Sequence, residues 1–174
     1  TVFLGIDPQD PQDLITEPGG RTRLEPSFAR QVHDFITRYR LAGYDLEIRS
    51  GRYIPLELEL KICVKPDHFR GDVAEAVRRR LSNRINPDGS RGFFHPDHFT
   101  FGDPVYLSRI YAAVEAVEGV DSVVITKLQR YGKAANGELR TGVLPIGTWE
   151  IARLDNDPNF MENGVLKISA GGGK

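Results

Sequence analysis

The chain has 174 residues, of which 40% are hydrophobic and 27% are charged. This composition is typical of a folded domain and excludes a largely disordered chain, and the length suffices for a core without disulfides or metal. The 23 basic and 24 acidic residues leave a net charge of −1, so no bulk attraction to nucleic acid or to an anionic membrane is expected. A single cysteine, Cys63, excludes an internal disulfide, and no apolar run approaches the ~20 residues of a membrane-spanning helix.

The first part of the chain is predicted to be an arm followed by a helix. Residues 1–25 are expected to be extended, to pack weakly on their own domain and to be ordered mainly by partners. A long helix is excluded there by Pro8, Pro11, Pro18, Gly19 and Gly20. Residues 26–50 are predicted to contain a helix over about 27–42 and a short strand at 44–48, with Gly43 closing the helix.

Residues 51–170 are predicted to form an α+β domain around one long strand. From Ile54 to Val64, apolar residues alternate with polar ones, so one face of the strand is buried and the other is solvated. Leu58 and Leu60 lie on the apolar face, and we expect both in the core. The other elements follow in chain order: a helix over about 69–85, a helix capped by Ser108 and ending near 118, strands at 120–131 and 146–154, and a short strand at 165–168.

This order predicts a small antiparallel or mixed sheet with two helices on one face. The arrangement is similar to the ferredoxin-like split βαβ, preceded here by a helix and an extended N-terminal arm. Residues 171–174, which include three consecutive glycines, are predicted to be a flexible tail.

The loop between the two helices contains the strongest metal-ligand candidates, His95, Asp97 and His98. Imidazoles and carboxylates are ligands of zinc and iron. However, the His-Pro-Asp-His string lacks the i, i+4 spacing of a helical zinc motif, and no cysteine lies nearby. A metal-binding ferredoxin-like enzyme or regulatory domain is therefore an alternative interpretation, and metal is not the favoured one.

A second alternative is an RNA-binding α+β module, because the helix at 69–85 presents arginines on its outer face. Against it, the strand positions that would face RNA are Glu57, Glu59 and Lys61, with no aromatic ring for stacking. A solvated or partner-facing helix surface is the favoured interpretation of the arginines. No serine or cysteine lies in the context of a catalytic nucleophile, so an enzyme is not expected.

The same loop is rich in aromatic residues. Rigid rings bury a large area at low entropic cost and dominate interface energies, so a loop with this composition is a candidate docking surface. We expect at least one of its four phenylalanines to be largely exposed. The partner-docking candidates are Phe93, Phe94, Phe99, Phe101 and Tyr106.

Three segments together resemble a known family. They are LEPSFARQVHDFITRYRLAGYDLEI (24–48), FFHPDHFTFGDPVYLSRIYAAVEAVEGVDSVV (93–124) and LPIGTWEIARLDNDPNF (144–160). They resemble the C-terminal part of baseplate assembly proteins of the phage baseplate J-like family, which belong to contractile phage tails and related injection particles. The resemblance extends over whole segments across most of the chain.

The resemblance implies a structural role without catalytic residues or cofactors. It implies a small α+β module that assembles by protein–protein contacts with other baseplate, hub or sheath proteins, or with copies of itself. It also implies a location in the bacterial cytoplasm during assembly, and afterwards in the baseplate of a phage virion or contractile injection particle. Neither nucleic acid nor a membrane is expected as a partner.

Overall fold

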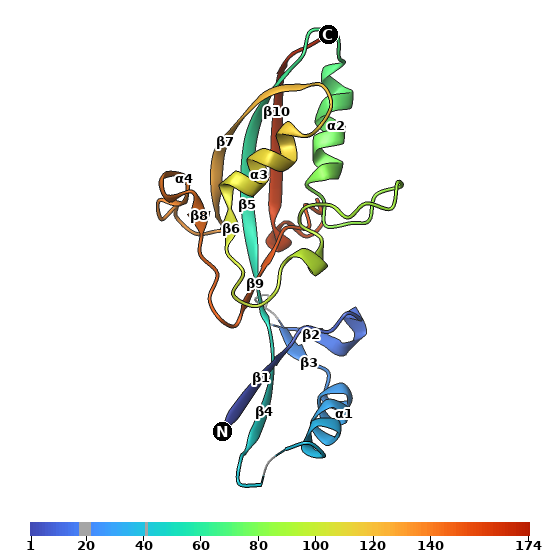
Figure 1. Ribbon diagram of the computed structural model, residues 1–174, viewed down its shortest axis with the longest axis vertical. Coiled ribbons are helices and arrows are strands. Elements are labelled where there is room, and N and C mark those ends of the chain that lie inside the picture. Colours follow the sequence, from blue (N-terminus) through green and yellow to red (C-terminus); the bar gives the residue numbers. More distant parts are fainter. Residues whose placement is uncertain (18–21, 41) are drawn as a thin grey trace.

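The structure is a computed structural model that describes residues 1–17, 22–40 and 42–174. Figure 1 shows an elongated molecule in which the N-terminal residues form a smaller part at one end. We call residues 1–50 the base module and residues 51–174 the sheet module. The two are joined by β5, a strand of 13 residues that begins beside the base module and runs the length of the sheet.

The described residues of the base module, 1–17, 22–40 and 42–50, form two pairs of strands and one helix. Its elements are β1 (Val2–Ile6), the 3-10 turn η1 (Pro11–Asp13), β2 (Leu14–Thr16), β3 (Thr22–Leu24), α1 (Pro26–Thr37) and β4 (Leu46–Ser50). Strands β1 and β4 pair in parallel, and β2 and β3 pair antiparallel.

The sheet module is built on a mixed sheet with two main helices. Its strands are β5 (Arg52–Val64), β6 (Val105–Tyr106), β7 (Val120–Arg130), β8 (Val143–Leu144), β9 (Glu150–Arg153) and β10 (Val165–Gly172). Its helices are α2 (Arg70–Arg80), α3 (Leu107–Glu115) and the short α4 (Glu138–Thr141), with 3-10 turns η2 (Pro96–His98) and η3 (Met161–Asn163). Strand β5 lies between β7, which is antiparallel to it, and β10, which is parallel. Strand β9 pairs in parallel with the first residues of β5.

The predicted alternation of the long strand is confirmed. Leu58 and Leu60 are 0% and 1% exposed, and they pack in one cluster with the apolar residues of α2 and α3. On the opposite face Lys61 and Cys63 are exposed, while Glu57 and Glu59 are partly covered. The two helices therefore cover one face of the sheet, as expected from a strand with a period of two.

The class is α+β, but the ferredoxin-like arrangement is not confirmed. In a split βαβ unit, the two strands joined by a helix are parallel and have another strand between them. Here two helices, α2 and α3, connect β5 to β7 (Figure 1). Each helix reverses the direction of the chain, so the second strand returns antiparallel and pairs directly with the first. Strand β10 then takes the other side of β5.

Both helices of the sheet module differ from prediction at an end. Helix α2 ends at Arg80 rather than near 85, and Ile85 is 63% exposed. The Ser82 hydroxyl accepts a hydrogen bond from the Arg84 amide at 3.3 Å, and such local bonds compete with helix continuation. Helix α3 begins at Leu107 after Tyr106, so Ser108 is not its N-cap. Its start is set instead by the Leu107 amide, which donates to the Gly142 carbonyl at 3.0 Å.

The helix of the base module is also shorter than predicted. Helix α1 ends at Thr37, so Gly43 does not close it, although Gly43 has a positive φ of 90°. The helix begins at Pro26 because the Glu25 carboxylate accepts from the amides of Ser27 and Phe28 at 2.7 and 3.0 Å. The predicted strand at 44–48 lies two residues later, at Leu46–Ser50.

The predicted arm and tail are both paired with the rest of the chain. Within the predicted arm, residues 1–25, strand β1 pairs along the whole of β4; the predicted breakers at 18–20 lie outside the described residues. At the other end, Gly171 and Gly172 belong to β10 and pair with Cys63 and Val64. The amides of Gly173 and Lys174 also donate to backbone carbonyls at 2.9 Å, so the residues predicted to be a flexible tail continue the pairing of β10.

Aromatic contacts join the two modules. Trp149 packs edge-on against Phe3 of β1 and Phe101 of the loop, with ring centroids 6.4 and 6.3 Å apart. The Tyr53 hydroxyl donates a hydrogen bond to the Asp7 carboxylate. Burial, together with this carboxylate, raises the pKa of Tyr53 well above its usual value, so the hydroxyl remains a donor throughout the physiological range.

Candidate functional site

The aromatic loop packs inward. Phe94 and Phe99 are each 3% exposed and their rings stack with centroids 5.6 Å apart. Phe93 and Phe101 are partly buried against the same core. The expectation that one of the four phenylalanines is largely exposed is therefore wrong, because the loop folds its rings onto each other and onto the core. Of the five docking candidates only Tyr106, 45% exposed, presents a large surface to solvent.

The residues weighed as metal ligands serve the geometry of the loop. The Nδ1 atom of His95 accepts a hydrogen bond from the Asp97 amide at 3.2 Å, and the Asp97 carboxylate lies 3.0 Å from the Arg91 guanidinium. The rings of His95 and His98 have centroids 6.0 Å apart. Within residues 1–17, 22–40 and 42–174, no three His, Cys, Asp or Glu side chains gather in a group that could hold a metal ion.

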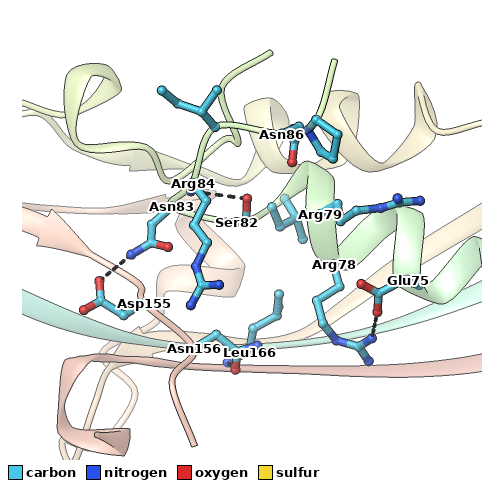
Figure 2. A pocket seen from close by; sticks show the side chains of 13 residues that line it. Glu75, Arg78, Arg79, Ser82, Asn83, Arg84, Asn86, Asp155, Asn156 and Leu166 are labelled. Atoms are coloured by element: carbon cyan, nitrogen blue, oxygen red, sulfur yellow. Dashed lines mark hydrogen bonds and ion pairs between the residues drawn. The ribbon is translucent and has the colours of Figure 1, made fainter. Parts of the chain in front are cut away.

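The arginines at the end of α2 divide between two surface hollows. The first, which we call the Asp155 hollow, has a volume of about 310 Å³. Figure 2 shows the Arg84 side chain reaching into it between Asn83 and Arg78. Its two carboxylates are already engaged, whereas Arg79 and Arg84 take part in no ion pair among the described residues. Arg78 pairs with Glu75, and Asp155 accepts hydrogen bonds from Asn83 at 2.9 Å and from Arg153 at 2.8 Å.

The second, which we call the Phe93 hollow, has a volume of about 350 Å³ and lies between the end of α2, the aromatic loop and α3. It is lined by Arg80, Arg91, Phe93, His98, Arg109, Ala112 and Ala113. Three guanidinium groups thus meet an aromatic ring and two small apolar side chains, and no carboxylate is part of the lining. The sequence indicated the arginines of α2 but not this gathering, because Arg91 and Arg109 come from other segments.

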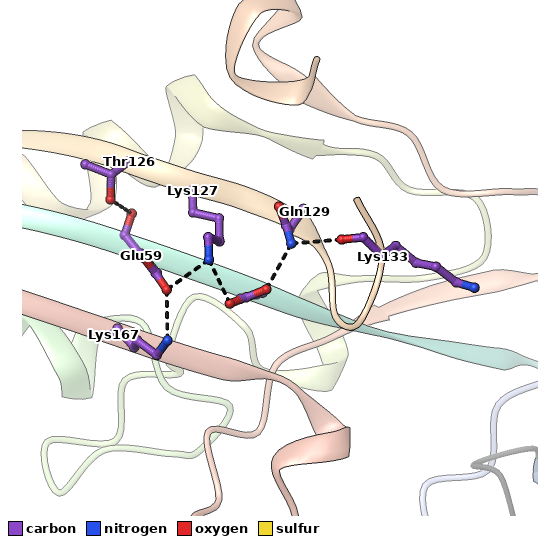
Figure 3. A network of polar contacts seen from close by, with 7 residues as sticks. Glu59, Thr126, Lys127, Gln129, Lys133 and Lys167 are labelled. Atoms are coloured by element: carbon purple, nitrogen blue, oxygen red, sulfur yellow. Dashed lines mark hydrogen bonds and ion pairs between the residues drawn. The ribbon is translucent and has the colours of Figure 1, made fainter. Parts of the chain in front are cut away.

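The uncovered face of the sheet holds a network of charges across three strands (Figure 3). Lys127 of β7 lies 3.0 Å from Glu57 and 3.2 Å from Glu59, both on β5. Lys167 of β10 donates to Glu59 at 2.9 Å. These contacts hold the pKa of Glu59 below its usual value, first through the hydrogen bond from Lys167 and then through that from Lys127.

We expect Glu59→Gln to lower stability in a pH-dependent way. A carboxyl with a lowered pKa in the folded state stabilises the fold above its unfolded pKa of about 4.3, and this contribution is lost as the pH falls through the folded value. Wild-type protein should therefore unfold at higher urea concentration than the variant at pH 7, and the difference should shrink as the pH falls below about 4.3. A difference that stays constant from pH 7 to pH 3 would show that the charge network contributes nothing.

Most apolar side chains of the base module are only partly buried, and several large ones are exposed. Among its described residues only Leu24 is fully buried. Helix α1 has a clear apolar face but no buried residue; Phe35 and Tyr39 are 59% and 74% exposed and pack on each other with centroids 5.5 Å apart. We call the surface formed by the exposed apolar residues of this module the base surface: Val2, Phe3, Phe35, Tyr39 and Tyr44.

A comparison with protein-family models finds no match to this chain, and a comparison with curated proteins finds none either. Throughout the described residues, each helix is too short or too polar to cross a bilayer.

Proposed function

We propose that this chain is a structural, non-enzymatic component of the baseplate of a contractile phage tail or injection particle. Its partners are other baseplate, hub or sheath proteins, or further copies of itself. It joins them in the bacterial cytoplasm and remains in the finished particle. The proposal draws on the resemblance of segments 24–48, 93–124 and 144–160 to the J-like family, and on the surfaces of the folded chain.

The observation that carries an assembly role is the base surface. A parallel pair of strands such as β1 and β4 is normally buried on both faces, and an isolated two-stranded sheet is marginally stable in water. Helix α1 is also amphipathic, and the exposed Phe35 within it and Tyr39 just beyond its end leave part of its apolar face uncovered. Exposed apolar side chains that lie together, as Phe35 and Tyr39 do, mark interaction sites. These features indicate that another protein packs against the base module and covers its exposed apolar side chains.

The proposal is tested by following the tagged chain in the bacterium that produces it. The chain should sediment with intact contractile particles, and labelling of the tag should mark the end of the tail that carries the baseplate. A chain that stays in the soluble fraction while contractile particles form normally would contradict the proposal.

We expect the double change Phe35→Ser with Tyr39→Ser to block particle assembly while leaving the isolated chain folded. Both rings are exposed, so the free energy of unfolding should change by no more than about 0.5 kcal/mol per site. Aromatic anchors carry much of the energy of an interface, so their loss should greatly reduce the number of complete particles seen by electron microscopy. Phe160→Ser is the matched control, because Phe160 is 54% exposed but lies in the sheet module. Normal particle numbers with the double variant would exclude the base surface as an assembly contact.

A further inference from the structure

We infer that the Phe93 hollow is a docking site for an acidic segment of a partner protein, which places carboxylate side chains on Arg80 and Arg109. This inference rests on the charge and shape of the hollow and is independent of the particle to which the chain belongs. It is also separate from the base surface, because the hollow lies between α2, α3 and the aromatic loop.

Two of the three guanidinium groups of the Phe93 hollow have no ion-pair partner among the described residues. Arg91 is paired with Asp97 at 3.0 Å, so one of the three guanidinium groups is already neutralised. Among the described residues, neither Arg80 nor Arg109 takes part in an ion pair. The Asp155 hollow, by contrast, contains the carboxylates of Glu75 and Asp155 in its own lining. The lining of the Phe93 hollow thus holds two unpaired guanidinium groups and no carboxylate, and a guanidinium fork matches a carboxylate in geometry as well as in charge.

The Phe93 hollow is already formed in the isolated chain. The Phe93 ring lies edge-on to the buried rings of Phe94 and Phe99, with centroids 4.9 and 5.8 Å away. The Phe93 amide donates to the Arg80 carbonyl at 2.8 Å, which ties the loop to the end of α2. The guanidinium of Arg109 lies 5.7 Å from the centre of the Phe93 ring. Binding to such a preorganised site loses little conformational entropy.

The apolar part of the lining favours protein over nucleic acid. Phe93, Ala112 and Ala113 offer a small apolar surface next to the arginines, which suits an aliphatic side chain flanked by carboxylates. Nucleic acid is held by many phosphate contacts along an extended basic track. Here Arg80 and Arg109 lie in one small hollow rather than along such a track, and the chain carries a net charge of −1.

The site can be tested with a capped peptide of sequence Gly-Glu-Leu-Glu-Gly-Gly, compared with its Gln counterpart Gly-Gln-Leu-Gln-Gly-Gly. Both are titrated to millimolar concentration into ¹⁵N-labelled protein at low salt, and the Nε–Hε signals of the arginines are followed by NMR. The Glu peptide should shift the signals of Arg80 and Arg109, and its affinity should fall as salt is added. The Gln peptide should bind at least about tenfold more weakly, since it cannot form charge-assisted hydrogen bonds.

The test variant combines Arg80→Gln with Arg109→Gln in one protein. The control is the single variant Arg84→Gln. Gln keeps part of the aliphatic stem, and all three arginines are exposed, so unfolding curves should be unchanged. The double variant should lose the binding, whereas Arg84→Gln, which removes one charge from the Asp155 hollow, should retain it. Equal binding of the two peptides, an equal loss in the control variant, or no shift of either arginine signal would overturn the proposal. Tighter binding of a short oligothymidylate through the same arginines would assign the hollow to nucleic acid instead.

Discussion

Leu60→Ala is expected to destabilise the sheet module by about 2–5 kcal/mol, the range for truncating a buried leucine. Leu60 is 1% exposed and lies in the middle of the central strand, where its partner on β7 is Ile125. The same cluster contains Val77 of α2 and Val114 of α3, both fully buried. The truncation therefore leaves a cavity where the sheet and both helices meet, and the surrounding structure can close it only in part.

The measurement is a urea titration followed by circular dichroism, with Lys61→Ala as the control. Lys61 is the next residue on the same strand, but its side chain is exposed on the opposite face. Its truncation should change the free energy of unfolding by no more than about 0.5 kcal/mol. A loss below about 1 kcal/mol for Leu60→Ala, or similar losses for the two variants, would mean that this face of β5 is not the core face.

Gly92→Ala is expected to cost about 1–3 kcal/mol or more, the range for forcing extra atoms into a packed site. A Cβ atom at residue 92 would lie 2.1 Å from the carbonyl oxygen of Ser82 and 2.7 Å from its carbonyl carbon. These are backbone atoms, and the same oxygen accepts a hydrogen bond from the Phe94 amide at 3.1 Å. The clash can be relieved only by moving the backbone that holds the aromatic loop against α2.

Gly71→Ala provides a control with the opposite sign. A Cβ atom there would meet nothing within 4 Å, and residue 71 lies in helix α2, where Ala is favoured over Gly by about 0.5–1 kcal/mol. Urea titrations should therefore show a loss for Gly92→Ala and a small gain for Gly71→Ala. Wild-type stability for Gly92→Ala would show that the loop can move away from Ser82 at no cost.

Elements with a regular local pattern could be predicted from the sequence, but their ends could not. The alternation from Ile54 to Val64 predicted both the strand and its buried face. The helix predicted over about 69–85 corresponds to α2, in which Val73 and Val77 are buried, but the prediction extended it beyond Arg80 to residue 85. There the chain has already turned back, because the amide of Gly92 bonds to the carbonyl of Arg84. The spacing of apolar residues along a helix contains no information about a backbone hydrogen bond such as the one between Gly92 and Arg84.

The candidate sites were predicted less well than the fold. Phenylalanines in the loop were assigned to docking because of their number, yet Phe94 and Phe99 stack inside the domain. The aromatic residues Phe35 and Tyr39 of the base module were not among the candidates, yet both are largely exposed. The exposure of a side chain depends on which residues pack against it. For the loop phenylalanines these residues come from distant parts of the chain, and for Phe35 and Tyr39 the described residues provide too few of them.

The sequence by itself determined the α+β class, the long central strand with its buried face, and the balanced overall charge, because each depends on composition or on the spacing of nearby residues. Only the tertiary structure decided that β10 lies parallel to β5, that residues 2–6 pair with β4, and that Arg80 and Arg109 meet at Phe93. These arrangements join residues that are far apart in the chain. Their free energies depend on the competition among all possible partners, which no local pattern records.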